Sequence, residues 1–359
     1  MLRNTILRLD ARVVKLRLEA GSMLTIDGSF GEGGGQIIRS SLALSLITGK
    51  AFRIYNVRAR REKPGLKPQH LTAVRAAAEI GGAQVEGAAV GSRDFTFIPG
   101  EVSPGQYHFA IGTAGATMLV LQTILPPLMI ADAPSMITLE GGTHNKHAPP
   151  FDFLQKAFLP LVNRTGPRVS LELERYGFYP PGGGRINVYI EPRTAPTKLE
   201  LETRGAILER CARALVVRLP ASIAERELAV VREHLNFSDE ELRVETSENA
   251  LSPGNVVMIE IRSEHLTEVF TAVGERGVRA EQVAEQAAIE AESYLATGAP
   301  VGEHLADQLL IPLALAGGGG YTTGTPSLHA TTNIEIIRKF LEVEIKLRPA
   351  GERLFRIEI

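Results

Sequence analysis

The spacing of apolar and polar positions along this chain predicts helices and strands, and one order of these elements recurs. From residue 36 the pattern predicts a helix, a strand, a second helix and two closing strands. These elements fall over residues 36–48, 52–57, 68–80, 93–98 and 106–111. The succession returns over residues 114–125, 136–139, 151–163, 169–173 and 185–190. A recurring order of elements indicates copies of one βα unit.

The end of the chain carries this order a third time, with helices over 302–316 and 334–341 and strands over 341–347 and 354–359. The preceding stretch has its own strands and helices, over residues 213–219, 222–235, 256–262, 270–273 and 278–295. We therefore predict an α/β (α+β) fold. Residues 23–202 and 299–359 would form a body of three repeated βα units, and residues 203–298 a small inserted α+β domain.

Residues 1–22 differ from the rest, because arginines and aliphatic residues are mixed there without the continuous apolar segment of a signal peptide. We interpret them as an N-terminal extension, with the first strand beginning at Met23.

Composition narrows the class of protein. Of 359 residues, 44% are hydrophobic and 22% charged, as in a globular protein, and the net charge of -2 means that any nucleic-acid contact would be a local patch. The single cysteine, Cys211, excludes an intramolecular disulfide and favours a reducing, cytoplasmic location. No apolar run reaches the ~18 residues of a membrane span, so no membrane partner is expected. Nothing in the sequence indicates the oligomeric state.

A glycine-rich loop over residues 27–36 precedes the first helix. Its glycines let the backbone approach a phosphate, and the helix that follows points its N-terminus at the loop. The spacing matches neither a Walker A nor a Rossmann motif. Glu32 would hold a divalent metal that bridges phosphates. A tight turn with a solvated Glu32 is an equal alternative.

A basic loop over residues 58–70 is the second candidate. Its cations suit a nucleic-acid backbone, and Gln69 and His70 lie at a helix start where free N–H groups add to an anion site. A solvated run of charges is the alternative, but Pro64 and Pro68 shape the loop and favour binding.

His329 is the third candidate, between a glycine run at 317–320 and the helix predicted from residue 334. A partly neutral imidazole there would be an accessible nucleophile, although a lone histidine beside a helix start is more often structural. Gln122 in an apolar helix and Asp307 at a helix start are weaker candidates. Gln122 is explained equally well as a buried amide that forms its own hydrogen bonds, and Asp307 as a residue that caps its helix. His144 and His147 match no zinc spacing.

Five segments together resemble the RNA 3′-terminal phosphate cyclases, namely residues 27–39, 63–70, 176–184, 304–308 and 328–333. The resemblance runs in order from Met23 to the end of the chain. It implies a body of three similar βα units, distantly like the enolpyruvyl transferases, with a small inserted domain.

The resemblance also implies an activity. These enzymes use ATP to convert an RNA 3′-phosphate into a 2′,3′-cyclic phosphodiester, releasing AMP and pyrophosphate. The family nucleophile, which forms a histidyl-AMP, falls on His329, and the acid that places Mg²⁺ or Mn²⁺ falls on Glu32. Positions around the nucleotide fall on Gln122, Pro149, His304, Leu305, Ala306, Asp307 and Gln308. Positions near the phosphates and the RNA end fall on Arg39, Arg58, Arg61, Gln69 and His70.

The family often has tyrosine where this chain has His304, which puts the contact with the base in doubt. Two alternatives to the cyclase are a non-catalytic, cyclase-like factor in ribosomal-RNA processing and an enolpyruvyl transferase. The matches at His329, Glu32 and residues 304–308 favour the cyclase. This interpretation requires that His329 face a cleft shared with Glu32, Asp307 and the basic loop near Arg58.

Overall fold

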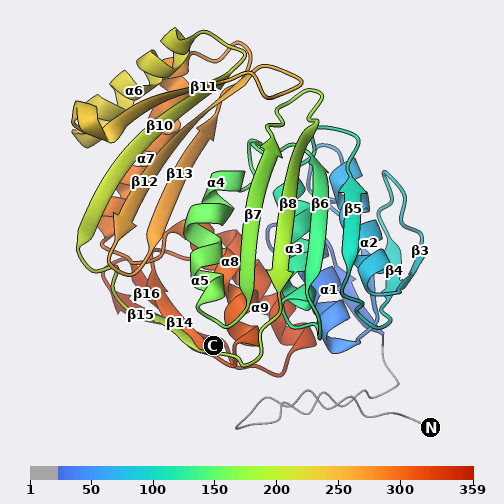
Figure 1. Ribbon diagram of the computed structural model, residues 1–359. Coiled ribbons are helices and arrows are strands. Elements are labelled where there is room, and N and C mark those ends of the chain that lie inside the picture. The colour runs from blue at the N-terminus through green and yellow to red at the C-terminus, as the bar shows by residue number, and fades with distance from the viewer. Residues whose placement is uncertain (1–22) are drawn as a thin grey trace.

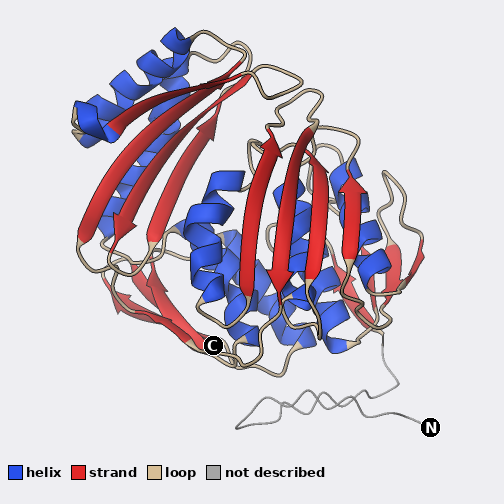
Figure 2. Ribbon diagram, in the orientation of Figure 1, coloured by secondary structure: helices blue, strands red, loops and turns tan. Residues whose placement is uncertain are grey.

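The computed structural model describes residues 23–359 and is a mixed α+β structure of four-stranded sheets with helices packed between and beside them (Figures 1 and 2). The N-terminal extension predicted over residues 1–22 lies outside the described residues. Within residues 23–359, no helix combines the length and apolarity that crossing a membrane requires.

Three of the sheets share one pairing pattern, in which two parallel strands are followed by two antiparallel strands. The first sheet has the order β1 (Leu24–Asp27), β2 (Phe52–Tyr55), β4 (Phe95–Ile98) and β3 (Gln84–Glu86). The second has β5 (Gln106–Ala110), β6 (Ser135–Gly141), β8 (Gly184–Glu191) and β7 (Arg168–Arg175). The third has β9 (Leu199–Leu201), β14 (Gly319–Thr323), β16 (Leu354–Glu358) and β15 (Lys346–Gly351).

Residues 93–98 and 106–111, predicted as the two closing strands of the first unit, do not pair with each other. β5 begins the second sheet beside β6, and β4 pairs with the short strand β3, which the sequence did not reveal. β3 escapes detection because its ends, Gln84 and Glu86, are exposed and polar. The first closing strand at the C-terminus begins later than predicted, since β15 starts at Lys346 and includes Pro349, whereas β16 begins at Leu354 as predicted.

The glycine run at 317–320, predicted as a loop, instead enters β14. At Gly319 an added Cβ would lie 2.2 Å from the carbonyl oxygen of Leu199, so glycine is what lets β9 lie beside β14. Neither strand was predicted, because β9 is three residues long and β14 is rich in glycine.

The helices of the body pack on one continuous hydrophobic core. α1 (Gly35–Thr48) is apolar on nearly all sides and contacts both α3 (Thr117–Leu128) and α9 (Leu328–Phe340). α2 (Pro68–Ile80) has the predicted bounds, and α8 (Glu303–Leu315) packs against α9. The helix predicted over 151–163 is divided into α4 (Phe151–Phe153), a π-helical turn (Leu154–Phe158) and α5 (Leu159–Asn163).

α9 begins six residues earlier than the predicted start at residue 334. Ser327 is the N-cap, and its Oγ accepts a hydrogen bond of 3.2 Å from the backbone N–H of Ala330. Thr332 Oγ1 donates to the carbonyl oxygen of Leu328 at 2.6 Å. The helix therefore starts at Leu328, directly after its N-cap, and His329 lies in its first turn.

The fourth sheet has the order β11 (Leu242–Ser247), β10 (Ile207–Val217), β12 (Gly254–Ser263) and β13 (Thr267–Val273), and it is covered on one face by α6 (Ala221–Leu235) and α7 (Ala280–Thr297). Along β12 the side chains alternate, so that Val257 and Ile259 face the helices while Val256 and Met258 pack with Phe178 of the body. Figure 1 shows this unit beside α4 and α5.

Candidate active site

The glycine-rich loop lies directly against the start of α9. Gly31 has φ +55°, and an added Cβ there would lie 2.1 Å from Thr332 Oγ1. The backbone N–H of Glu32 donates to the same oxygen at 3.0 Å. Glycine is therefore required twice, for the backbone conformation and for the close approach. This contact joins residues 300 positions apart in the sequence.

The contact brings Glu32 to His329. The Glu32 carboxylate is 4% exposed, and its Oε1 lies 4.0 Å from Nδ1 of His329. It accepts a 3.0 Å bond from the backbone N–H of Gln36, at the N-terminus of α1, and a 2.5 Å ion pair from Arg61. The distance to His329 exceeds a hydrogen bond, so the two side chains face each other without being locked together.

Burial lowers the pKa of the His329 imidazole below its ordinary value, and the charges of Arg39 and Arg61 act in the same direction against Glu32. Half of the side chain is nevertheless exposed, at 51%. The ring is therefore neutral at physiological pH and remains accessible. Because Nδ1 faces Glu32, Nε2 is the ring nitrogen directed away from that carboxylate.

Hydrogen bonds connect four helices beneath this pair. Arg39 donates from Nε to Gln122 Oε1 at 2.9 Å and from Nη2 to Gln36 Oε1 at 2.7 Å. Ser40 donates to Asn333 Oδ1 at 2.6 Å, and Asn333 donates to the carbonyl oxygen of Asp307 at 3.0 Å. Burial lowers the pKa of Arg39 to about 10, which leaves the guanidinium charged at neutral pH. A fixed cation therefore lies within the site.

The start of α8 contributes two further titrating groups. Burial raises the pKa of Asp307 to about 7, although His304 and Arg39 oppose the shift. The side chain of Glu290, 3.5 Å away, raises the pKa of His304 to about 9 by hydrogen bonding. His304 is therefore a cation at neutral pH, whereas Asp307 is divided between its charged and neutral forms.

A cavity of about 400 Å³ lies between these elements, within the size range of ligand sites. Its lining includes His329, Arg39, Gln122, Pro149, His304, Asp307 and Gln308. The structure thus gathers these seven predicted residues around one space, with cationic, acidic and apolar side chains that suit a nucleotide.

The basic loop is divided in two by its contacts. Arg61 points to Glu32, whereas Arg58 is buried and donates to the carbonyl oxygens of Lys63 and Gly65 at 2.7 and 2.9 Å. Arg58 has φ +53° and shapes the loop from inside. Of the four parts of the predicted cleft, His329 and Asp307 line the cavity, whereas Glu32 lies beside it against His329 and Arg58 makes its contacts within its own loop.

Gln69 and His70 also make contacts within the protein. Gln69 Oε1 accepts from the backbone N–H of Ala116 at 3.2 Å, and His70 Nδ1 accepts from Lys67 at 3.1 Å. Burial, helped by Arg39, lowers the pKa of His70 to about 3, so its ring is neutral. An added Cβ at Gly35 would lie 2.8 Å from His70 Nε2, which places this ring beside the glycine-rich loop.

Comparison with known proteins agrees with this geometry. The family model described as RNA 3′-terminal phosphate cyclase matches residues 30–347. The RNA 3′-terminal phosphate cyclase of Koribacter versatilis (strain Ellin345) is 54% identical over 326 residues, 91% of this chain and 92% of that protein. The protein of the same name from Ectopseudomonas mendocina (strain ymp) is 50% identical over 336 residues, covering 94% and 98%. This chain belongs to the RNA 3′-terminal phosphate cyclase family.

Two positions predicted from the family lie away from the cavity. Leu305 and Ala306 are 0% and 2% exposed and point into the hydrophobic core, and the Ala306 carbonyl oxygen accepts from the Tyr321 hydroxyl. Helical spacing explains this, because Asp307 and Gln308 share a face with His304 while the two residues between them face inward. In this member of the RNA 3′-terminal phosphate cyclase family, α8 therefore contributes its polar side chains to the cavity.

Sequence reasoning missed the contribution of the fourth sheet to this cavity. Thr271 of β13 and Gln286 and Glu290 of α7 lie in its lining, together with Val269, Ala272 and Val273. No motif marks these residues, and their position depends on how the inserted segment packs on the body. Periodicity identifies the faces of a strand but not what another part of the chain places against it.

The structure also limits how a metal would be held. Within residues 23–359, no group of three His, Cys, Asp or Glu side chains is arranged to bind a metal ion. Glu32 alone offers too few oxygens for a resident ion. It does fit an ion that arrives with phosphate oxygens already bound, since Mg²⁺ commonly takes one or two carboxylates and completes its shell from phosphates and water.

Proposed function

We propose that this protein converts an RNA 3′-phosphate end into a 2′,3′-cyclic phosphodiester at the expense of ATP. The observation that carries the proposal is that His329 and Glu32, from opposite ends of the chain, face each other beside a nucleotide-sized cavity. Relatives that share about half of its residues carry the name of this activity.

In the first step, the free lone pair on Nε2 of His329 attacks the α-phosphorus of ATP. A P–N bond forms, the bond from the α-phosphorus to the bridging oxygen breaks, and pyrophosphate leaves. Neutral imidazole is the reactive form, and its lowered pKa keeps it neutral. Arg39 and Arg61 place positive charge beside the glycine-rich loop, where the phosphates would lie.

In the second step, an oxygen of the RNA 3′-phosphate attacks the same phosphorus and the P–N bond breaks, which restores His329. An RNA end joined to AMP through a pyrophosphate results. In the third step, the neighbouring ribose 2′-hydroxyl loses its proton and attacks the RNA phosphorus, and AMP leaves. Adenylylation is required because AMP is a far better leaving group than a phosphate oxygen.

A divalent cation, Mg²⁺ or Mn²⁺, bound with the ATP phosphates would neutralise the negative charge that develops on the leaving pyrophosphate. Glu32 would hold that cation from the protein side, and the ion pair with Arg61 orients the Glu32 carboxylate. Gln122, Pro149, His304, Asp307 and Gln308 would surround the nucleoside.

We also propose that the three sheets of like pairing represent three copies of one βα unit, a body distantly similar to the enolpyruvyl transferases. Residues 203–298 would be an insertion between the first strand and the first helix of the third copy. The separate hydrophobic cluster of that segment supports this division. A cytoplasmic location stays a prediction from the single cysteine.

The test is covalent labelling with ATP radiolabelled at the α-phosphate, in Mg²⁺ or Mn²⁺. We expect acid-labile, base-stable label on the wild-type protein and none on His329→Ala. The control is His108→Ala, which removes an exposed histidine that pairs with Glu140 on the second sheet. An RNA oligonucleotide with a 3′-phosphate should then become resistant to phosphatase. Absence of label on the wild type would refute the proposed function, and label on His329→Ala would refute the nucleophile.

A further inference from the structure

The inserted segment forms one wall of the nucleotide cavity. Its β13 and α7 contribute Thr271, Gln286 and Glu290, and they face Pro149, Pro150 and Phe153 of the body across the same space. The width of the cavity therefore depends on how the fourth sheet is held against the body. A displaced wall would weaken its hydrogen bonds and its packing against a bound ligand, because both interactions fall off steeply with distance.

Two ion pairs that cross between the walls are solvent-exposed. Lys146 pairs with Glu275 at 2.6 Å and His304 with Glu290 at 3.5 Å, and each of these side chains is more than two-fifths exposed. Exposed pairs contribute little to stability. Apolar contacts attach the sheet as well: Val273 packs against the cluster around Phe178, and Val269 belongs to the hydrophobic core of the body. Both of these residues line the cavity.

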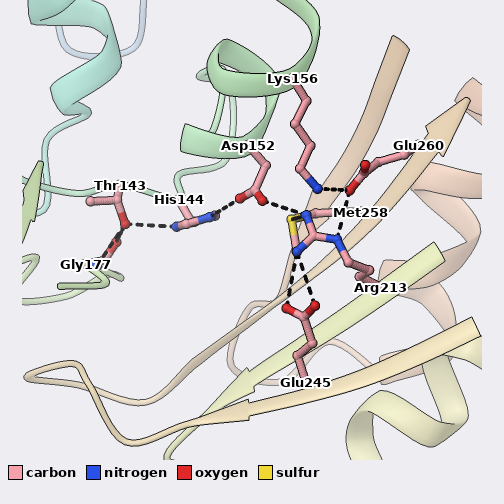
Figure 3. Close-up of polar contacts among 9 residues, drawn as sticks. All are labelled: Thr143, His144, Asp152, Lys156, Gly177, Arg213, Glu245, Met258 and Glu260. Carbon is pink, nitrogen blue, oxygen red and sulfur yellow. Dashed lines mark hydrogen bonds and ion pairs between the residues drawn. The ribbon is translucent and has the colours of Figure 1, made fainter. Parts of the chain in front are cut away.

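A buried connection lies beside the cavity and is centred on Arg213 of β10 (Figure 3). Arg213 donates from Nη2 to Asp152 Oδ1 at 2.6 Å, from Nε to Glu260 Oε1 at 2.8 Å and from Nη1 to Glu245 at 3.2 Å. Lys156 of the body pairs with Glu260 from the opposite side. Asp152 and Lys156 belong to the body, whereas Arg213, Glu245 and Glu260 belong to the fourth sheet.

The connection continues into the cavity wall. Asp152 Oδ2 lies 3.1 Å from His144 Nε2, and His144 Nδ1 lies 2.8 Å from Thr143 Oγ1 (Figure 3). His144 is buried and immediately precedes residues 145–150, which line the cavity. Phe153, next to Asp152 in α4, lines it as well. The guanidinium of Arg213 therefore contacts Asp152 directly and is connected to His144 through Asp152. These two residues flank the stretch that contains Pro149.

The three hydrogen bonds of Arg213 require a guanidinium, and a lysine ammonium would not form them in the same arrangement. Arg213 and Asp152 are 13% and 11% exposed, so their charges are satisfied by each other rather than by water. Although burial alone would raise it, the His144 hydrogen bond and the Arg213 charge hold the pKa of Asp152 well below its usual range. The planar guanidinium donates in three directions at fixed angles, which a lysine ammonium does not reproduce.

We infer that Arg213 is a positioning residue for nucleotide binding, which fixes the wall formed by the fourth sheet against the segment from His144 to Phe153. The inserted segment is thus part of the nucleotide site. The inference rests on the proposed function, because it takes the cavity to be the ATP site.

The experiment compares Arg213→Gln with Arg210→Gln. Arg210 lies on the same strand and also loses an ion pair, a more exposed one at 32% and 23% against 13% and 11%, and its partner Glu241 belongs to the inserted segment. For each variant we would measure the melting temperature, the KM for ATP and the kcat of histidyl-AMP formation. We expect Arg213→Gln to raise the KM for ATP about tenfold or more with a much smaller change in kcat. Arg210→Gln should leave the KM unchanged.

An unchanged KM in folded Arg213→Gln would overturn the inference, and so would an equal rise in both variants, since that would indicate general destabilisation. If Arg213→Gln does not fold, Arg213→Lys decides, because it keeps a charge at Asp152 and should still raise the KM. If the wild type forms no histidyl-AMP, the proposed function fails first. Calorimetric titration with ATP, which needs no chemistry, then tests whether Arg213 affects nucleotide binding.

Discussion

His329 acquires its character from neighbours that are remote in the sequence. Glu32, Arg39 and Arg61 all lie in the first unit, about 300 residues away in the sequence. Together with burial, their charges determine the pKa of the His329 ring. The same histidine on an isolated helix would titrate near its ordinary value.

The pH dependence of adenylylation should report this environment. The reactive form is the neutral imidazole, and its pKa lies below 6.5, so the rate of histidyl-AMP formation should be constant near pH 7 and above. It should fall only as the pH drops below the ordinary histidine range. Single-turnover labelling between pH 5 and pH 8, with the melting temperature measured at each pH, checks this. Because Asp307 lines the same cavity and has a pKa of about 7, the profile is measured in Asp307→Asn as well. A rate that still rises steeply between pH 7 and 8 in that variant would contradict the prediction.

Gly31 provides a second test at the scale of one residue. Gly31→Ala places a methyl group 2.1 Å from Thr332 Oγ1, so the loop must move away from α9 and carry Glu32 with it. We expect histidyl-AMP formation to fall about tenfold or more.

The matched control for Gly31 is Gly91→Ala. Gly91 has φ +88°, but an added Cβ there meets nothing within 4 Å. It should cost about 1 kcal/mol of stability for the backbone conformation and leave labelling unchanged. Labelling rates and melting temperatures of the two variants separate the steric contact from backbone strain. Equal labelling rates would show that the contact between Gly31 and Thr332 is not needed.

At the scale of elements, the fourth sheet and α8 are joined by a buried carboxylate. Glu268 of β13 is 2% exposed and accepts a 2.6 Å bond from the backbone N–H of Gly302, the N-cap of α8. Burial raises the pKa of Glu268 to about 7 from an ordinary value of 4.5. The folded protein therefore holds this proton more tightly than the unfolded chain does.

Between pH 4.5 and 7 the folded state binds more protons at Glu268 than the unfolded state, so its contribution to stability is lost as the pH rises. The loss is at most about 3 kcal/mol. Glu268→Gln keeps an acceptor for Gly302 and removes the titration. Its melting temperature should fall less than that of the wild type between pH 5 and pH 8. Glu285→Gln, an exposed position on α7, is the control and should follow the wild type.

At the scale of the whole molecule, the candidate site lies where three parts of the chain meet. The glycine-rich loop comes from the start of the described chain and α9 from its end. The cavity beside them is bounded by α3, α8 and the fourth sheet. The inserted segment completes the cavity from the side opposite Pro149 and is held there by buried charges. A unit with its own hydrophobic cluster thus contributes side chains to the lining of the cavity.

The sequence by itself determined which stretches are helical, because helical periodicity and capping are local. α2 has the predicted bounds, α1 differs from prediction by one residue at its start, and α8 differs by one residue at each end. The resemblance identified the family, because five motifs in the same order are specific to a family even where each motif alone is not. Only the tertiary structure decided that β5 pairs with β6, that Glu32 reaches His329, and that Arg213 reaches Asp152. Such contacts join residues tens to hundreds of positions apart, and they depend on which surfaces pack together rather than on the spacing of residues along the chain.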